Sequence, residues 1–119
     1  NEKTAYKRRF LISVGEKLKR VEAADIAYFY ALDKSVFFKT FDNKTLHADY
    51  ALDRLEEMLD PEQFFRINRK YIVNMESIEE MVLWSRNRIK LYLRPEASDE
   101  ENTIVSVSRS SDFKNWINS

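Results

Sequence analysis

The sequence predicts a mainly β domain with about ten short strands and two short helices. Apolar and polar residues alternate in short runs along most of the chain, which is the pattern of half-buried strands. A period near 3.6 residues, typical of a helix, occurs only in residues 52–59 and near the C-terminal end. The 119 residues, of which 44% are hydrophobic and 13% aromatic, suffice for one domain with a single core.

The first half of the chain predicts five strands. Gly15, the only glycine, lies in the first of two expected hairpin turns. The polar link 32–34 has hairpin length and joins two runs rich in β-branched and aromatic residues. The expected strands are 10–14, 18–21, 26–31, 35–41 and 45–48.

The second half predicts a helix, further strands and a closing helix. The helix 52–59 has its leucines on one face and charged residues on the other, and it ends before Pro61. The exposed acidic stretch 95–102 reads as a loop, and Ser108 is expected to N-cap the closing helix. The expected strands are 64–67, 71–73, 78–84, 89–93 and 103–107.

The composition argues against catalysis and metal binding. The absence of cysteine excludes a disulfide framework, a thiolate zinc site and a cysteine nucleophile, and it is compatible with a reducing cytosol. His47 is the only histidine, and one glycine cannot build a phosphate-binding loop. We therefore expect no enzyme activity, no metal and no cofactor. No apolar run approaches the roughly 20 residues that span a bilayer, so no membrane contact is expected.

The charged residues are balanced in number but segregated along the chain. Lys plus Arg and Asp plus Glu both total 20. Residues 1–20 contain seven bases and two acids, and residues 84–94 contain four bases and no acid. This distribution fits one positive face directed at a phosphate backbone. The alternative is that these charges coat a solvated surface.

Three polar segments offer side chains suited to DNA: residues 33–35, 66–70 and 106–110. Arginine and amide side chains can read base edges, whereas lysines, hydroxyls and a helix N-terminus can bind phosphates. Each segment alone could be a solvated turn. Their flanking sequences are IAYFY at 26–30, LDRLEEML at 52–59, FFRINRKYIVN at 64–74 and VSVSR at 105–109, with Phe113 and Trp116 following.

Together these strings resemble the LytTR DNA-binding domain family, the C-terminal output domain of LytR/AlgR-type bacterial response regulators. The resemblance runs from about Arg9 to Ile117, and the run 64–74 is its most specific part. It implies an elongated stack of small antiparallel β-sheets with two helices. It also implies sequence-specific binding of double-stranded DNA by loops that enter successive major grooves.

The resemblance also implies roles for individual residues. Arg69 and Arg109 suit guanine edges, and Val36 or its neighbour Ser35 would read bases after the turn at Lys34. Asn68 could pair with adenine or donate to a phosphate, and Arg66 has an alternative structural role in which an acid pairs with it. The implied base contacts are Arg69, Arg109, Ser35, Val36 and Asn68, and the implied phosphate contacts are Lys34, Arg66, Lys70 and Ser108.

The family context implies partners beyond this chain. Residues 1–8 are expected to be a linker from an N-terminal receiver or sensor domain, and residues 9–119 the DNA-binding domain. A homodimer of the full-length protein on paired direct repeats, in the cytoplasm, is expected. The alternative function is a β-rich protein-interaction module anchored by exposed aromatics, for which the candidates are Tyr28, Tyr30, Phe37 and Trp84.

Overall fold

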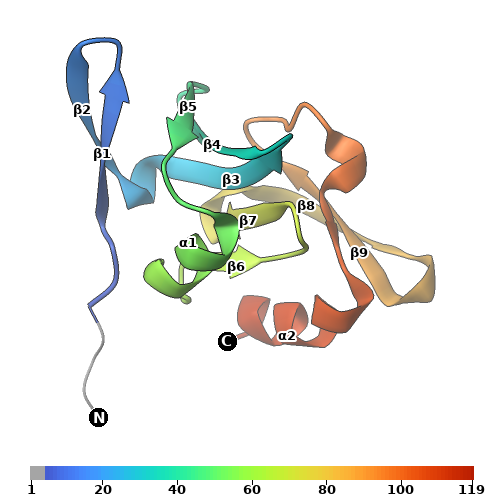
Figure 1. Cartoon of the computed structure of the whole chain (residues 1–119). Helices are drawn as coiled ribbons and strands as arrows, with labels where there is room; N and C mark the ends of the chain where they lie inside the picture. The colour runs from blue at the N-terminus through green and yellow to red at the C-terminus, as the bar shows by residue number, and fades with distance from the viewer. Residues whose placement is uncertain (1–4) are drawn as a thin grey trace.

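The computed structural model describes residues 5–119 and confirms the mainly β prediction (Figure 1). Ten strands form three small antiparallel sheets with the orders β1-β2, β5-β4-β3-β7-β6 and β10-β9-β8. The strands are β1 (Arg9–Val14), β2 (Lys17–Glu22), β3 (Ile26–Leu32), β4 (Ser35–Thr40), β5 (Thr45–Ala48), β6 (Phe64–Arg66), β7 (Tyr71–Asn74), β8 (Ile78–Trp84), β9 (Arg88–Leu93) and β10 (Ile104–Val105).

Two α-helices and four short 3-10 helices complete the fold of the described residues. The α-helices are α1 (Leu52–Met58) and α2 (Val107–Ile117), and the 3-10 helices are η1 (Ala23–Asp25), η2 (Met75–Ser77), η3 (Ser85–Asn87) and η4 (Glu100–Asn102). Asn74 has the structural role expected of a turn residue. Its side chain accepts a bond from Glu76 N at 3.0 Å and donates one to Ile26 O at 2.9 Å.

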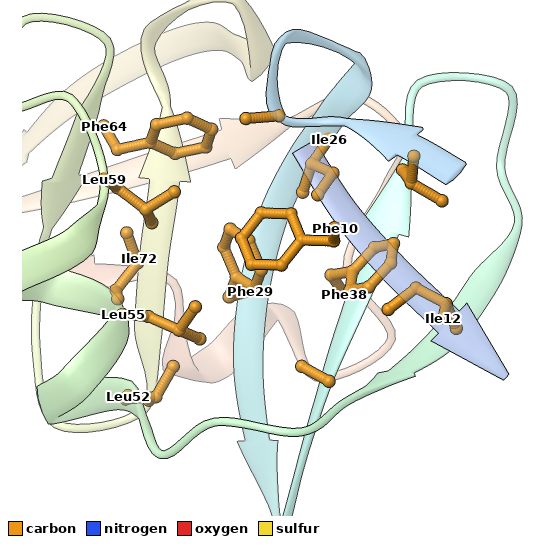
Figure 2. Packing of buried hydrophobic residues seen from close by; sticks show 13 residues of the cluster. Phe10, Ile12, Ile26, Phe29, Phe38, Leu52, Leu55, Leu59, Phe64 and Ile72 are labelled. Atoms are coloured by element: carbon orange, nitrogen blue, oxygen red, sulfur yellow. The ribbon is translucent and has the colours of Figure 1, made fainter. Parts of the chain in front are cut away.

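The five-stranded sheet separates two hydrophobic clusters because alternate side chains of a strand point to opposite faces. On one face, Phe29 and Phe38 pack against Phe10 from β1 and Leu55 from α1 (Figure 2). The ring centroids of Phe29 and Phe38 lie 5.6 Å apart. This cluster attaches the first hairpin and α1 to the central sheet.

On the other face, the second cluster joins the central sheet to β9, β10 and α2. Tyr28 and Tyr71 pack there with Leu91 and with Phe113 of α2. The two tyrosine rings lie 5.9 Å apart, and burial is the main cause that raises the pKa of both hydroxyls. Helix α2 is therefore packed against the sheet that carries residues 66–70, the second of the three polar segments.

The start of α2 differs from the prediction. The helix begins at Val107, with Ser106 rather than Ser108 as its N-cap residue, and the preceding strand β10 has only two residues. Ser106 has extended backbone angles (φ −66°, ψ 157°), and its amide donates to Ile67 O at 3.0 Å. This bond joins the end of β10 to the loop between β6 and β7. It also places Ser108 and Arg109 in the first turn of α2.

The fold gathers the three polar segments of the sequence around one loop. Ala31 N, close to the β3–β4 turn, donates to Lys70 O at 2.9 Å, and Ser106 N donates to Ile67 O in the same loop. The β1–β2 hairpin projects from the opposite side of the molecule (Figure 1).

Candidate DNA interface

The central loop, residues 66–70, connects β6 to β7 and is closed by backbone and core contacts. Ile67 is fully buried, and its amide donates to Tyr71 O at 3.1 Å. Phe64 and Tyr71, which flank the loop, are buried in the two different clusters. The apolar residues of the FFRINRKYIVN run therefore anchor the loop, and its polar residues remain for other contacts.

The side chain of Asn68 holds this loop in place, and both its donor hydrogens and both its acceptor positions are used. Its Nδ2 donates to Asn102 O and Ile104 O, both at 2.8 Å. Its Oδ1 accepts from Lys70 N at 2.7 Å and from Tyr71 N at 3.0 Å. An amide offers two donor hydrogens and two acceptor lone pairs. A base or phosphate contact would have to break one of these internal bonds, so the geometry favours a positioning role over the base contact expected from the sequence.

Arg66 is also directed into the protein. Its guanidinium lies 2.8 Å from Asp53 Oδ1 and 3.1 Å from Glu56 Oε1, both on α1, and its side chain is only 9% exposed. Its Nε and Nη2 donate to Asn68 O at 2.8 Å and to Arg69 O at 3.0 Å. The structural alternative for Arg66 is thus favoured over a phosphate contact.

The ion pair with Arg66 affects the titration of Asp53. The hydrogen bond from the guanidinium and then its charge lower the pKa of this exposed carboxyl. Asp53 is therefore ionised at neutral pH, and α1 presents a negative surface to Arg66. The sequence suggests an acid as partner of Arg66 but not which one, because Glu56 and Asp53 are 10 and 13 residues away in the chain.

Arg69 and Arg109 remain available to a ligand. Arg69 is exposed, and its side chain has no hydrogen bond or ion pair within residues 5–119. Arg109, 37% exposed, is steadied by Arg66 O at 3.3 Å and by Glu56 Oε2 at 3.7 Å from its Nη1. The two guanidinium groups belong to elements joined by the bond between Ser106 and Ile67.

Lys70 and Ser108 flank these arginines. Lys70 Nζ lies 3.3 Å from Asp99 Oδ2, and Tyr71 donates its hydroxyl hydrogen to the other oxygen of Asp99. Burial opposes ionisation of Asp99, but the hydrogen bonds from Tyr71, Asn102 and Lys70 outweigh it and lower its pKa. Ser108 is exposed in the first turn of α2, where unpaired backbone N–H groups favour an anion.

The β3–β4 turn presents polar residues, and Val36, which follows it in β4, points inward. Asp33 has a positive φ of 57°, and Lys34 next to it is exposed. Val36 pairs across from Ala31 and Ala48 and packs against the first cluster. The structure therefore favours Ser35, on the opposite face of β4, over Val36 as the ligand contact of this turn.

The structure leaves few exposed aromatic anchors for the alternative function as a protein-interaction module. Tyr28, Tyr30 and Phe37 form a chain of packed rings with Tyr71, so among the proposed anchors only Trp84 is an exposed aromatic. His47 is exposed beside Asp49, and residues 5–119 contain no acid or histidine group arranged for a metal. No helix in this part of the chain is long and apolar enough to cross a membrane.

Comparison with known proteins identifies one family. The model of the LytTr DNA-binding domain matches residues 16–118. The sensory transduction protein LytT of Bacillus subtilis (strain 168) is 32% identical over 101 residues, which are 85% of this chain and 39% of that protein. The protein of the same name from Oceanobacillus iheyensis is 25% identical over the same shares.

A solved structure supports the fold. It is the LytTr DNA-binding domain of a Bacillus cereus protein described as a methyl-accepting/DNA response regulator. It has a TM-score of 0.79 and 21% identity, and the match covers 95% of this chain and 99% of that one. The chain spans well under half of the LytT proteins, whose remaining length has no counterpart here.

Proposed function

The chain belongs to the LytTR DNA-binding domain family, and on this premise we propose that it reads base edges in successive major grooves through Arg69 and Arg109. The observation that carries the proposal is the contrast among its arginines. Arg66 uses its whole guanidinium in internal contacts. The Arg69 side chain makes none within residues 5–119, and Arg109 is held only through its Nη1, so both have donors left for a ligand. A guanidinium carried by a fixed element suits the two acceptors of a guanine edge.

Four further residues would bind the phosphates around these bases. Lys34 and Ser35 border the β3–β4 turn, Lys70 ends the central loop, and Ser108 lies at the start of α2. Lysine and hydroxyl groups at such positions fix the register of a protein on DNA without reading its sequence. In this proposal Arg66 and Asn68 position the loop, and Val36 packs against the core.

The longer relatives suggest the setting of the domain. We propose that it is the output domain of a cytoplasmic regulator, that a receiver or sensor domain precedes it, and that two copies bind paired direct repeats. Of the proposed linker 1–8, residues 1–4 lie outside the described residues. Lys7 N donates to Met58 O at 2.8 Å and Arg8 O accepts from Ala23 N at 2.7 Å, so the end of this segment is fastened to the domain. The family gives no reason to expect catalysis.

Selection of bound duplexes from a random DNA library tests the proposal. The enriched sequence is then titrated across salt concentrations with the native chain, Arg69→Ala and Arg109→Ala. We expect one motif, a steep loss of affinity with salt, and a loss of about 10-fold to 100-fold in discrimination at one position of the motif for each variant.

Arg20→Ala is the matched control, because Arg20 is an exposed arginine on the distant β1–β2 hairpin. It should leave discrimination unchanged. Failure to enrich any motif, or an equal loss in all three variants, would reject base reading by Arg69 and Arg109. The interaction-module alternative would then be favoured if binding to a protein partner is insensitive to salt.

A further inference from the structure

The β8 strand is an apolar edge that nothing covers in the described part of the chain. β8 is the last strand of the sheet β10-β9-β8, so one side of its backbone has no strand partner. Its residues 81–84 are Met, Val, Leu and Trp in succession, and all are exposed; Leu83 is 71% exposed. An edge strand of this kind pairs readily with another chain unless charges, a proline or a covering element prevents it.

Apolar side chains lie on both faces of this edge. Met81 and Leu83 oppose Leu91 and Ile89 of β9, which are buried in the second cluster. These two β8 residues therefore continue the apolar face of the sheet beyond the part that the core covers. On the other face, Val82 lies near Trp84, over which the Arg88 guanidinium is stacked at 6.0 Å.

The charges at the two ends of β8 are opposite. Glu79 and Glu80 lie near its start, and Arg86 and Arg88 follow its end at the tip of the β8–β9 hairpin. Glu79 is paired with Arg94, whereas Glu80 has no ion-pair partner within residues 5–119. A second copy that runs antiparallel would bring the acidic end of each strand to the basic end of the other. The edge is thus complementary to itself.

We propose that β8 pairs antiparallel with β8 of a second copy about a two-fold axis near Val82. In this register Met81 of each copy opposes Leu83 of the other, and Glu80 opposes Trp84 beside the arginines of the tip. The two three-stranded sheets become one continuous sheet of six strands. An isologous contact of this kind closes on itself and stops at a dimer.

The proposed contact uses none of the proposed DNA-binding residues and does not rest on them, although η3 at the end of β8 lies against α2. Domains bound to direct repeats share one orientation, whereas a two-fold axis relates the copies joined through β8. The β8 contact therefore joins domains that are free or that lie on different DNA segments, and it can be measured without DNA.

Sedimentation equilibrium of the chain, from micromolar to about millimolar concentration, tests the contact. We expect a reversible monomer–dimer equilibrium, weakened at least 10-fold by Leu83→Lys, because each dimer then places two lysines in the apolar centre. Leu18→Lys is the control, since Leu18 is 68% exposed on the other hairpin. Thermal unfolding verifies that both variants are folded. A monomer at all concentrations, or equal weakening by both variants, overturns the proposal.

A charge-swap experiment tests the orientation of the strands. One variant carries Glu80→Lys, and the other carries Arg86→Glu and Arg88→Glu. Each alone should dimerise at least 5-fold more weakly than the native chain, because like charges then meet at both ends of the contact. An equimolar mixture should form heterodimers more strongly than either variant forms homodimers, because both ends of the mixed contact are again complementary. No preference for the heterodimer contradicts antiparallel pairing through β8.

Discussion

The central loop and the β3–β4 turn approach the same region of the molecule, but they are held in different ways. Side chains from within the central loop and carbonyls from η4 and β10 fix the loop, and two carboxylates of α1 hold Arg66. The turn is held by its two strands and by the positive φ of Asp33. The difference indicates a division of labour. Arginines carried by fixed elements can discriminate between bases, whereas the exposed side chain of Lys34 suits a phosphate, whose charge does not depend on sequence.

Among substitutions in the central loop, Asn68→Ala is expected to have the largest effect. The variant removes four hydrogen bonds and leaves the carbonyls of Asn102 and Ile104 without a donor. We expect a loss of about 2 to 3 kcal/mol in the free energy of unfolding, measured by urea denaturation. Discrimination between DNA sequences should fall with it, even when most of the protein remains folded. Asn115→Ala, at an exposed position of α2, should change neither quantity.

The variant Arg66→Lys distinguishes a positioning role of Arg66 from a phosphate contact. Lysine keeps the charge but cannot reach two carboxylates and two carbonyls with one fork of donors. We expect a loss of about 1 to 2 kcal/mol in stability and weaker base discrimination, with an unchanged slope of log affinity against log salt. Near-native discrimination and stability in this variant would contradict the positioning role and return Arg66 to the phosphate contacts.

The variant Asp99→Asn is expected to change the free energy of unfolding by a smaller amount, and this change depends on pH. Its pKa is lowered in the folded chain by bonds from Tyr71, Asn102 and Lys70 that outweigh burial. A lowered folded pKa stabilises the protein above the unfolded value, and this stability is lost as the pH falls through the folded value. Denaturation from pH 7 to pH 2 should therefore show a decline below about pH 4 that is shallower in Asp99→Asn. An equally steep decline in the variant would show that Asp99 does not hold the loop.

Much of the fold could be predicted from the sequence, because short-range patterns of apolar and polar residues determine where most strands and helices lie. The period of two located most strands, and the leucine spacing with Pro61 located α1 within one residue at its end. The start of α2 was misplaced because Ser106 and Ser108 have equal intrinsic preference for the cap. A contact with Ile67, 39 residues earlier in the chain, decides between them.

The site was only partly predictable for a similar reason. Residue type shows that Arg66, Asn68 and Arg69 can each contact DNA, but not which of them face the protein. That depends on carboxylates of α1 and carbonyls of η4 and β10, which come close only in the fold. Val36 illustrates the same limit, because its direction follows from pairing with Ala31 and Ala48.

The smallest effect is expected in the β3–β4 turn. Lys34→Ala should weaken binding to matched and mismatched duplexes by the same factor, about 2-fold to 5-fold at moderate salt, and reduce the salt slope by about 0.9, the value for one lost phosphate contact. Titration of two duplexes that differ at one base measures both quantities, and Lys17→Ala on the β1–β2 hairpin is the matched control. A change in the ratio of the two affinities would mean that Lys34 reads a base. The turn would then need a fixed geometry like that of the central loop, and the division of labour between them would fail.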